Sequence, residues 1–148
     1  MLPNDMSARS EALYGAWLAG TCLGAAGVAL HHKLCHTLGG SFNLPHAETH
    51  TIILPHALAY NAPAVPEAMM RIARAMKTDD APLALFQLAK AVGATVSLKD
   101  IGMSESDIER ATEIALTNPY WNPVPVTRAG VTAILRNAYW GREPGSCA

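Results

Sequence analysis

The chain has 148 residues, the size of a single domain, and 50% of them are hydrophobic. Only 16% are charged, against about 25% in average globular proteins, which excludes a disordered chain and a coiled-coil rod. The net charge is −1, so no basic excess supports nucleic acid as a partner. Three cysteines without Cys-x-x-Cys spacing favour free thiols in the cytoplasm, and the polar first residues do not resemble a signal peptide.

Helix signals dominate the first part of the chain. The pattern predicts one long helix over Ser7–Leu38, which ends at Gly39 and Gly40 because glycine commonly follows a helix. A short loop over residues 41–44 should lead to Pro45, which suits the first position of a second helix. Pro55 should end or kink that helix near His56.

The second part of the chain also predicts helices. Apolar spacing indicates helices over Glu67–Met76 and Pro82–Val92. Ser-Glu-Ser-Asp from residue 104 resembles a capping box that opens a helix to about residue 116, and a last helix should span Thr127–Trp140. Thr95–Leu98 is the one plausible strand and is too short to build a sheet. The predicted fold class is therefore all-α, a helical bundle.

One segment of the first predicted helix, Ala12–Leu30, contains no charged residue. Its 19 residues pass a crude length test for a membrane span. The segment is rich in alanine and glycine and has few large apolar side chains, so its hydropathy is modest. We favour a core helix whose small residues allow another helix or a ligand to approach closely, and we expect no membrane partner.

All six histidines lie between Ala12 and Pro66, where only Lys33 and Glu48 are formally charged. Imidazoles buried in an uncharged region cost free energy unless they form hydrogen bonds or bind a ligand. The pattern therefore indicates a polar site inside an apolar region.

Two histidine pairs have helical spacing. His32 and His36 are four residues apart, as are His46 and His50, so each pair lies on one face of its helix. A tight hairpin between the two helices would bring the pairs together as a metal or proton-transfer site. The alternative is that single histidines are satisfied core groups, which we favour for His31 and His56, while Cys35 is interpreted as a small core residue.

Several fixed spacings in this region agree with one family signature. The chain reads His-His-Lys-Leu-Cys-His-Thr-Leu-Gly-Gly from residue 31, Leu-Pro-His-Ala-Glu-Thr-His from residue 44 and Leu-Pro-His-Ala-Leu-Ala-Tyr-Asn from residue 54. This pattern resembles the iron-containing alcohol dehydrogenase family. The Pro-His-Ala-Glu-Thr-His variant, with Leu-Lys-Asp-Ile-Gly-Met from residue 98 and Asn-Pro-Tyr-Trp-Asn-Pro from residue 118, resembles its maleylacetate reductase branch.

The resemblance covers nearly the whole chain and implies the C-terminal all-α domain of that family. Family members also have an N-terminal α/β dinucleotide-binding domain, whereas this chain has no Gly-x-Gly-x-x-Gly motif. We therefore expect residues 1–148 to form a single helical domain that lacks the nucleotide-binding part, which the same or a separate chain would supply. The complete protein is expected to be a cytoplasmic homo-oligomer.

The resemblance also implies roles for individual residues. The family's metal is held by an aspartate and three histidines, of which two correspond to His32 and His46 and two have no counterpart in this chain. His32 and His46 then either hold Fe²⁺ or Zn²⁺ or bind the substrate. His36 corresponds to a histidine beside the nicotinamide and is the expected proton donor. His50 replaces an asparagine of the alcohol dehydrogenases and should act on the substrate, while Lys33 pairs with a substrate carboxylate.

The implied reaction is the reduction of the carbon–carbon double bond of maleylacetate, a dicarboxylate, by NADH or NADPH to give 3-oxoadipate during aromatic compound degradation. One alternative is another oxidoreductase of the iron-containing alcohol dehydrogenase type, against which Ala47 and His50 argue. A second is a non-catalytic helical metal-binding module built on the four paired histidines. A third is an interaction domain that docks a partner through Ala12–Leu30.

Overall fold

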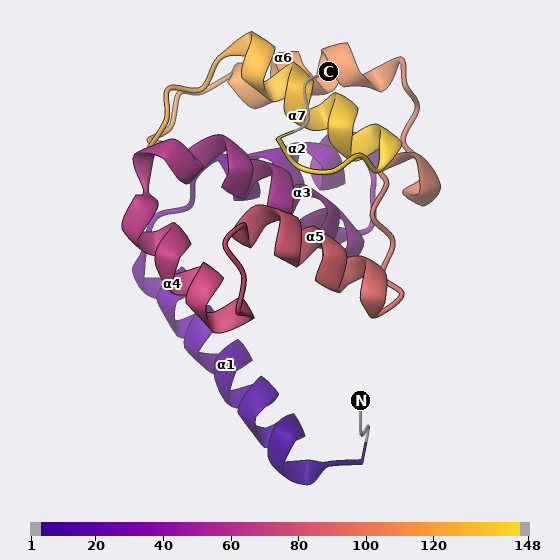
Figure 1. Ribbon diagram of the computed structural model, residues 1–148. Coiled ribbons are helices and arrows are strands. Elements are labelled where there is room, and N and C mark those ends of the chain that lie inside the picture. Colours follow the sequence, from indigo (N-terminus) through magenta and orange to yellow (C-terminus); the bar gives the residue numbers. More distant parts are fainter. Residues whose placement is uncertain (1–3, 146–148) are drawn as a thin grey trace.

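The computed structural model describes residues 4–145 of the chain (Figure 1). Cys147, one of the three cysteines, lies outside the described residues. Seven α-helices and two short 3₁₀ helices follow one another in the described part: α1 (Met6–Ala25), α2 (Leu30–Phe42), α3 (His46–Asn61), η1 (Ala62–Ala64), α4 (Pro66–Met76), α5 (Ala81–Ala91), η2 (Lys99–Ile101), α6 (Asp107–Leu116) and α7 (Arg128–Trp140).

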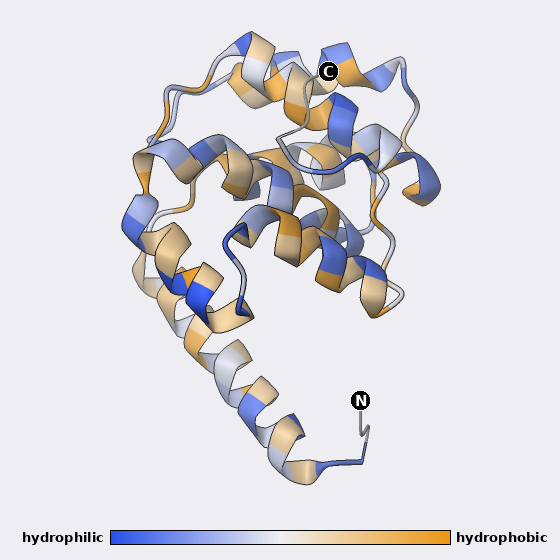
Figure 2. Ribbon diagram, viewed as in Figure 1, coloured by the Kyte–Doolittle hydropathy of each residue, from blue (hydrophilic) through white to orange (hydrophobic). Residues whose placement is uncertain are grey.

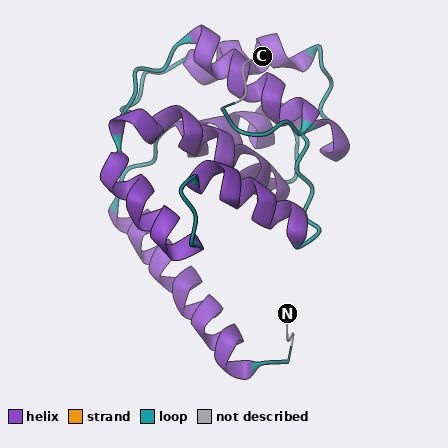
Figure 3. Cartoon of the chain, in the orientation of Figure 1, coloured by secondary structure: helices purple, strands orange, loops and turns teal. Residues whose placement is uncertain are grey.

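The all-α fold class is confirmed, since helices and connecting loops account for all the described residues (Figure 3). Helices α2, α3, α6 and α7 pack against one another and supply most of the buried core. Leu34 and Leu38 of α2, Ile53 of α3 and Leu135 of α7 are fully buried. Burial of such a side chain contributes about 1.5–3 kcal/mol to folding, so this four-helix core carries the stability of the domain.

The long first helix predicted over Ser7–Leu38 is wrong, because it is two helices bent by 92° at a break of four residues. The break starts at Ala26, whose backbone is extended. Gly39 and Gly40 lie inside α2 and do not end it, since an interior glycine costs only about 1 kcal/mol and packing outweighs that cost. The helix ends instead at Phe42, where Asn43 adopts the left-handed conformation with φ of 54°.

Helix α1 does not belong to the core, which corrects the expectation for Ala12–Leu30. None of its residues is buried, and it projects from the rest of the described chain (Figure 1). Hydrophobic and hydrophilic residues are mixed along it without forming one stripe (Figure 2), and large apolar side chains such as Leu13 and Trp17 are exposed. Among the described helices, none is by itself long and apolar enough to cross a membrane, and only α1 and α2 taken together across their bend reach that length and composition.

Helix α3 continues past Pro55 to Asn61, so the predicted end of the helix near His56 is wrong. A proline inside a helix costs about 3 kcal/mol through the lost hydrogen bond and the crowded carbonyl. Buried neighbours on the same helix, including Ile52, Ile53 and Ala57, offset that cost. Pro45 lies one position before the first helical residue and acts as the N-cap.

The remaining helices follow the sequence prediction closely. Helices α4, α5 and α7 match the predicted spans within one residue at each end, and Thr127 caps α7 by accepting a hydrogen bond from Gly130 N–H. The capping box is half formed, because the Asp107 carboxylate accepts from Ser104 N–H at 3.3 Å while Ser106 is the N-cap.

No strand forms over Thr95–Leu98 in the described chain. This segment instead binds the end of α7. The hydroxyl of Ser97 donates to the Tyr139 carbonyl at 2.9 Å, and Leu98 N–H donates to the Ala138 carbonyl at 3.0 Å. A strand needs a partner strand for its backbone groups, and here the helix C-terminus takes that place.

Candidate functional site

Helices α2 and α3 form a hairpin that brings five imidazole rings together, and we call this group the imidazole cluster. The ring of His50 lies 4.8 Å from that of His31, 5.0 Å from that of His32 and 4.3 Å from that of His46, measured between centroids. His36 lies at the edge of the cluster, 6.0 Å from His32 and 6.5 Å from His46. The two predicted pairs therefore meet across the hairpin, with His50 at the centre.

The cluster runs from the buried hairpin outward to solvent. His31, His32 and His50 are half-buried, whereas His36 and His46 are exposed. The exposed members leave one side of the cluster open to a small molecule or to another protein surface.

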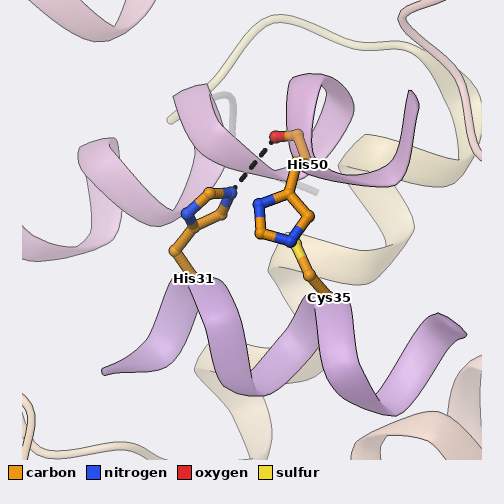
Figure 4. A group of neighbouring side chains, drawn as sticks. All are labelled: His31, Cys35 and His50. Atoms are coloured by element: carbon orange, nitrogen blue, oxygen red, sulfur yellow. Dashed lines mark hydrogen bonds between the residues drawn. The ribbon is translucent and has the colours of Figure 1, made fainter. Parts of the chain in front are cut away.

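Three side chains at the inner end of the cluster converge closely (Figure 4). His31 and Cys35 are one helical turn apart on α2, and His50 faces them from α3. One ligand atom from each residue lies within 4.8 Å of the others. The Nε2–H group of His31 donates to the backbone carbonyl of His50 at 3.2 Å, because a carbonyl oxygen only accepts, and this bond joins the two helices.

Burial and mutual repulsion keep the inner imidazoles neutral. Burial, and then the neighbouring histidines, lower the pKa of His50 from 6.5 to about 4. Burial also lowers the pKa of His31 and of His32, with a smaller contribution from adjacent imidazoles. At neutral pH these three rings therefore carry no charge, and each presents one N–H donor and one basic nitrogen.

Lys33 lies next to the cluster in sequence, but its ammonium group contacts a different residue. Its Nζ lies 5.6 Å from the centre of the Tyr120 ring, in the loop between α6 and α7. The Tyr120 hydroxyl is buried without a hydrogen-bond partner, and burial raises its pKa. A cation over an aromatic ring gains about 0.5–2 kcal/mol, so this contact holds Lys33 at the margin of the cluster.

His56 lies outside the imidazole cluster. Its side chain is 3% exposed, and burial lowers its pKa from 6.5 to about 4. Its ring packs against Phe86 of α5 at 6.4 Å and lines a pocket of about 210 Å³ with Tyr60 and Gly130. The core interpretation of His56 therefore agrees with its position, although its Nε2 has no hydrogen-bond partner in the described chain.

A hollow of about 750 Å³ lies beside α4, between the end of α3 and the start of α5. It is lined by side chains such as Met69, Arg74 and Asp80, and no residue of the imidazole cluster reaches it. We place the candidate site at the cluster nonetheless, because acid–base and metal-binding side chains converge there.

Sequence reasoning missed two members of this site. His31 was interpreted as a core group, yet its ring contacts both His32 and His50. Cys35 is fully buried, as expected of a core residue, but its sulfur also faces the two histidines. The signal was present in the four-residue spacing of His31 and Cys35, which places both on one face of α2.

The metal position implied for His32 and His46 is not completed by the residues described. Within residues 4–145, the three side chains whose ligand atoms lie close enough together to hold a metal ion are those of His31, Cys35 and His50. His32 and His46 are not part of it, so at that position the chain offers two ligands. A stable Zn²⁺ or Fe²⁺ site needs at least three protein ligands.

Comparison with known proteins places this arrangement in a family. The model of the Fe-containing alcohol dehydrogenase family, C-terminal part, matches residues 2–139. Maleylacetate reductase from Pseudomonas sp. (strain P51) is 56% identical over 142 residues, which are 96% of this chain and 40% of that protein. Maleylacetate reductase from Pseudomonas knackmussii is 55% identical over 144 residues, 97% of this chain and 41% of that protein.

Solved structures give the same result. Maleylacetate reductase from Agrobacterium tumefaciens superposes with a TM-score of 0.91 at 46% identity, over 97% of this chain and 41% of that one. The enzyme from Rhizobium sp. strain MTP-10005 also has a TM-score of 0.91, at 47% identity over the same shares. The chain thus spans about 40% of the length of the curated relatives it matches. It belongs to the Fe-containing alcohol dehydrogenase family and corresponds to the C-terminal part of that family.

Proposed function

We propose that this chain forms the substrate-site domain of an NADH- or NADPH-dependent maleylacetate reductase. The observation that carries the proposal is the imidazole cluster, in which four histidines of the family signature meet across the α2–α3 hairpin. Its support is the high identity to maleylacetate reductases over nearly the whole chain. A cytoplasmic enzyme fits this chemistry, because nicotinamide cofactors are available in that compartment.

The reaction adds a hydride and a proton across a carbon–carbon double bond. When bound, the reduced nicotinamide supplies the hydride. The hydride forms a bond to the double-bond carbon that lies farther from the keto group. The electron pair of the double bond then moves toward the keto oxygen, and an enolate results. Addition of one proton to the carbon next to the keto group completes 3-oxoadipate.

We assign that proton to His36. It is the exposed imidazole of α2 and can regain a proton from solvent after each turnover. The neutral rings of His32 and His50 present N–H groups that can bind the keto oxygen as negative charge develops on it. This assignment uses the side chains of the chain alone and routes no step through a metal.

The substrate carboxylates need positive partners. His46 begins α3, and the positive end of a helix dipole favours an anion there, although the exposed Glu48 in the same turn opposes it. Lys33 is the one formal cation between Ala12 and Pro66 and is assigned to the second carboxylate. A dicarboxylate could thus bind with one end at each side of the cluster.

Helix α1 fits a larger assembly. Its apolar side chains are exposed along its length, and exposed apolar area of this kind marks surfaces that bind another protein surface. In the relatives, the matched stretch is one part of a longer chain. We infer that α1 packs against the part of such a protein that lies outside the matched stretch, which includes the expected nucleotide-binding domain.

A chimaera tests the proposed activity. This chain replaces the matching stretch of maleylacetate reductase from Pseudomonas sp. (strain P51), and NADH or NADPH oxidation is followed with maleylacetate. We expect activity well above that of the relative without this stretch. His36→Ala should lower kcat by about 10²–10⁴-fold, the usual contribution of a general acid. Gln87→Ala, an exposed change on α5, serves as the control and should leave kcat unchanged.

A folded chimaera that turns over nothing, or one whose activity survives His36→Ala unchanged, would contradict the proposal. Should the chimaera not fold, the 148-residue chain itself is titrated with maleylacetate while the histidine ring signals are followed by NMR. We expect shifts in the signals of His32, His36, His46 and His50, with His56 unaffected. Absence of those shifts at saturating concentration also counts against the proposal.

A further inference from the structure

We propose that His31, Cys35 and His50 form a binding site for a thiophilic divalent metal ion such as Zn²⁺. This site is separate from the position of His32 and His46 that the family resemblance implies. The two positions share no ligand, and the new site is built entirely from this chain. The proposal does not depend on the proposed reductase activity.

The donor set carries the chemical argument. Two imidazole nitrogens and one cysteine sulfur are ligands that Zn²⁺ prefers. Carboxylates, which would favour Mg²⁺ or Ca²⁺, are missing from this group of three. The structure therefore selects a borderline or soft metal over a hard one.

The geometry allows three bonds to one ion. The ligand atoms lie within 4.8 Å of one another, while a tetrahedral site with bonds of 2.0–2.3 Å separates its ligands by roughly 3.4–3.8 Å. A contraction of about 1 Å closes the difference. Small side-chain rotations supply it, and the His31 nitrogen that faces the group exchanges its hydrogen bond to the His50 carbonyl for a bond to the metal. Three protein ligands leave the fourth position for water or an anion, as in catalytic zinc sites.

One atom of the group is otherwise unexplained. Nε2 of His50 is buried and has no hydrogen-bond partner in the described chain. A buried polar atom without a partner destabilises the fold, and Figure 4 shows this nitrogen directed toward the sulfur of Cys35. A bound metal would use the lone pair of that nitrogen and remove the cost.

The surroundings of Cys35 also fit a metal better than a reactive thiol. Its side chain is fully buried beside Leu34 and Leu38, so it is shielded from oxidation. A metal ion that reaches it through the exposed side of the imidazole cluster would displace the thiol proton and stabilise the thiolate. Binding should therefore release a proton.

Cobalt provides the test, because Co²⁺ occupies zinc sites and a thiolate ligand gives it a strong near-ultraviolet charge-transfer band. The 148-residue chain carrying Cys22→Ser and Cys147→Ser, so that Cys35 is the one remaining thiol, is titrated with CoCl₂. We expect the band to rise to saturation at one equivalent of Co²⁺ and to disappear when Zn²⁺ is added. About one proton should be released for each ion bound.

Variants assign the band to the three residues. Cys35→Ala should abolish the band, and His50→Asn and His31→Asn should each weaken Co²⁺ binding by at least about tenfold, the lower limit for a lost metal-supporting group. His36→Ala, which changes an exposed histidine of the same helix, is the matched control and should keep the band. Far-ultraviolet circular dichroism checks the fold of every variant.

Two results would overturn the site. One is Co²⁺ binding to the folded chain without any charge-transfer band, which would place the ion on imidazoles alone. The other is a band that persists in the folded His31→Asn and His50→Asn variants. Since His50→Asn alters a half-buried position, it remains informative even where Cys35→Ala does not fold. Neither result bears on whether the complete protein reduces maleylacetate.

Discussion

Asn61 and Asn122 pair through both atoms of their side-chain amides, although 61 residues separate them in sequence. The Nδ2 group of Asn122 donates to Oδ1 of Asn61 at 2.7 Å, and Nδ2 of Asn61 donates back at 3.1 Å. Oδ1 of Asn122 also accepts from Leu30 N–H, the first residue of α2. One amide thus connects the end of α3 to the start of the helix that carries three cluster histidines.

Replacement of that amide should destabilise the domain. Asn122→Ala leaves the part-buried Leu30 N–H and the Asn61 amide without partners, and each such loss costs about 1–3 kcal/mol. We expect the free energy of unfolding to fall by about 2–4 kcal/mol, measured by urea denaturation. Trp121→Ala, at the neighbouring position and 77% exposed, should change it by less than about 0.5 kcal/mol. Equal effects of the two substitutions would refute this account.

Replacement by alanine should raise the stability of the domain at one glycine and lower it at another. Gly40 lies inside α2 with open space where a Cβ would be placed, so Gly40→Ala should stabilise by about 0.5–1 kcal/mol. A Cβ at Gly130 would collide with the ring of Tyr60, and Gly130→Ala should destabilise by about 1–3 kcal/mol. Thermal unfolding of both variants gives the signs directly.

A second substitution checks the reason for the Gly130 effect. Tyr60→Leu removes the ring that a Cβ would meet, at the cost of the hydrogen bond that its hydroxyl donates to the Pro125 carbonyl. In that background Gly130→Ala should cost much less than in the parent chain. An unchanged cost would mean that the ring of Tyr60 does not cause the destabilisation.

His56 should make the domain sensitive to acid. Its pKa is about 4 in the folded protein and 6.5 ordinarily, so the unfolded chain binds the proton more tightly. Its contribution is therefore fully present above pH 6.5 and is lost as the pH falls toward 4, on the order of 3 kcal/mol for this buried ring. Urea unfolding at several pH values should show a steeper loss in the parent than in His56→Leu. Parallel stability curves for the parent and His56→Leu would show that His56 does not cause the loss of stability at low pH.

The two described cysteines should differ sharply in reactivity. Cys22 is exposed, whereas Cys35 is buried and its pKa is raised to about 12 by that burial. Because the thiolate is the reacting form, iodoacetamide should modify Cys22 rapidly and Cys35 only when the chain unfolds. Mass spectrometry of peptides from the folded and urea-unfolded chain measures both rates. Rapid modification of Cys35 in the folded chain would contradict its buried position.

The sequence by itself determined the all-α class, the spans of the later helices and four of the five histidines of the site. These features follow from local rules. Helical spacing places His32 with His36 and His46 with His50 on their faces, and Thr127 is a residue type that caps helices. Their agreement with the structure is expected, because each rule needs only neighbours within one or two turns.

Only the tertiary structure decided where the helices end and which side chains meet. The free energy of helix termination at Gly39 or Pro55 is a few kcal/mol at most, and burial of Leu38, Ile53 and similar residues exceeds it. After the bend, the Leu30 N–H donates to the side chain of Asn122, a distant contact that local spacing cannot reveal. The convergence of His31, Cys35 and His50 likewise arises from packing between two helices, since non-local contacts set their distance.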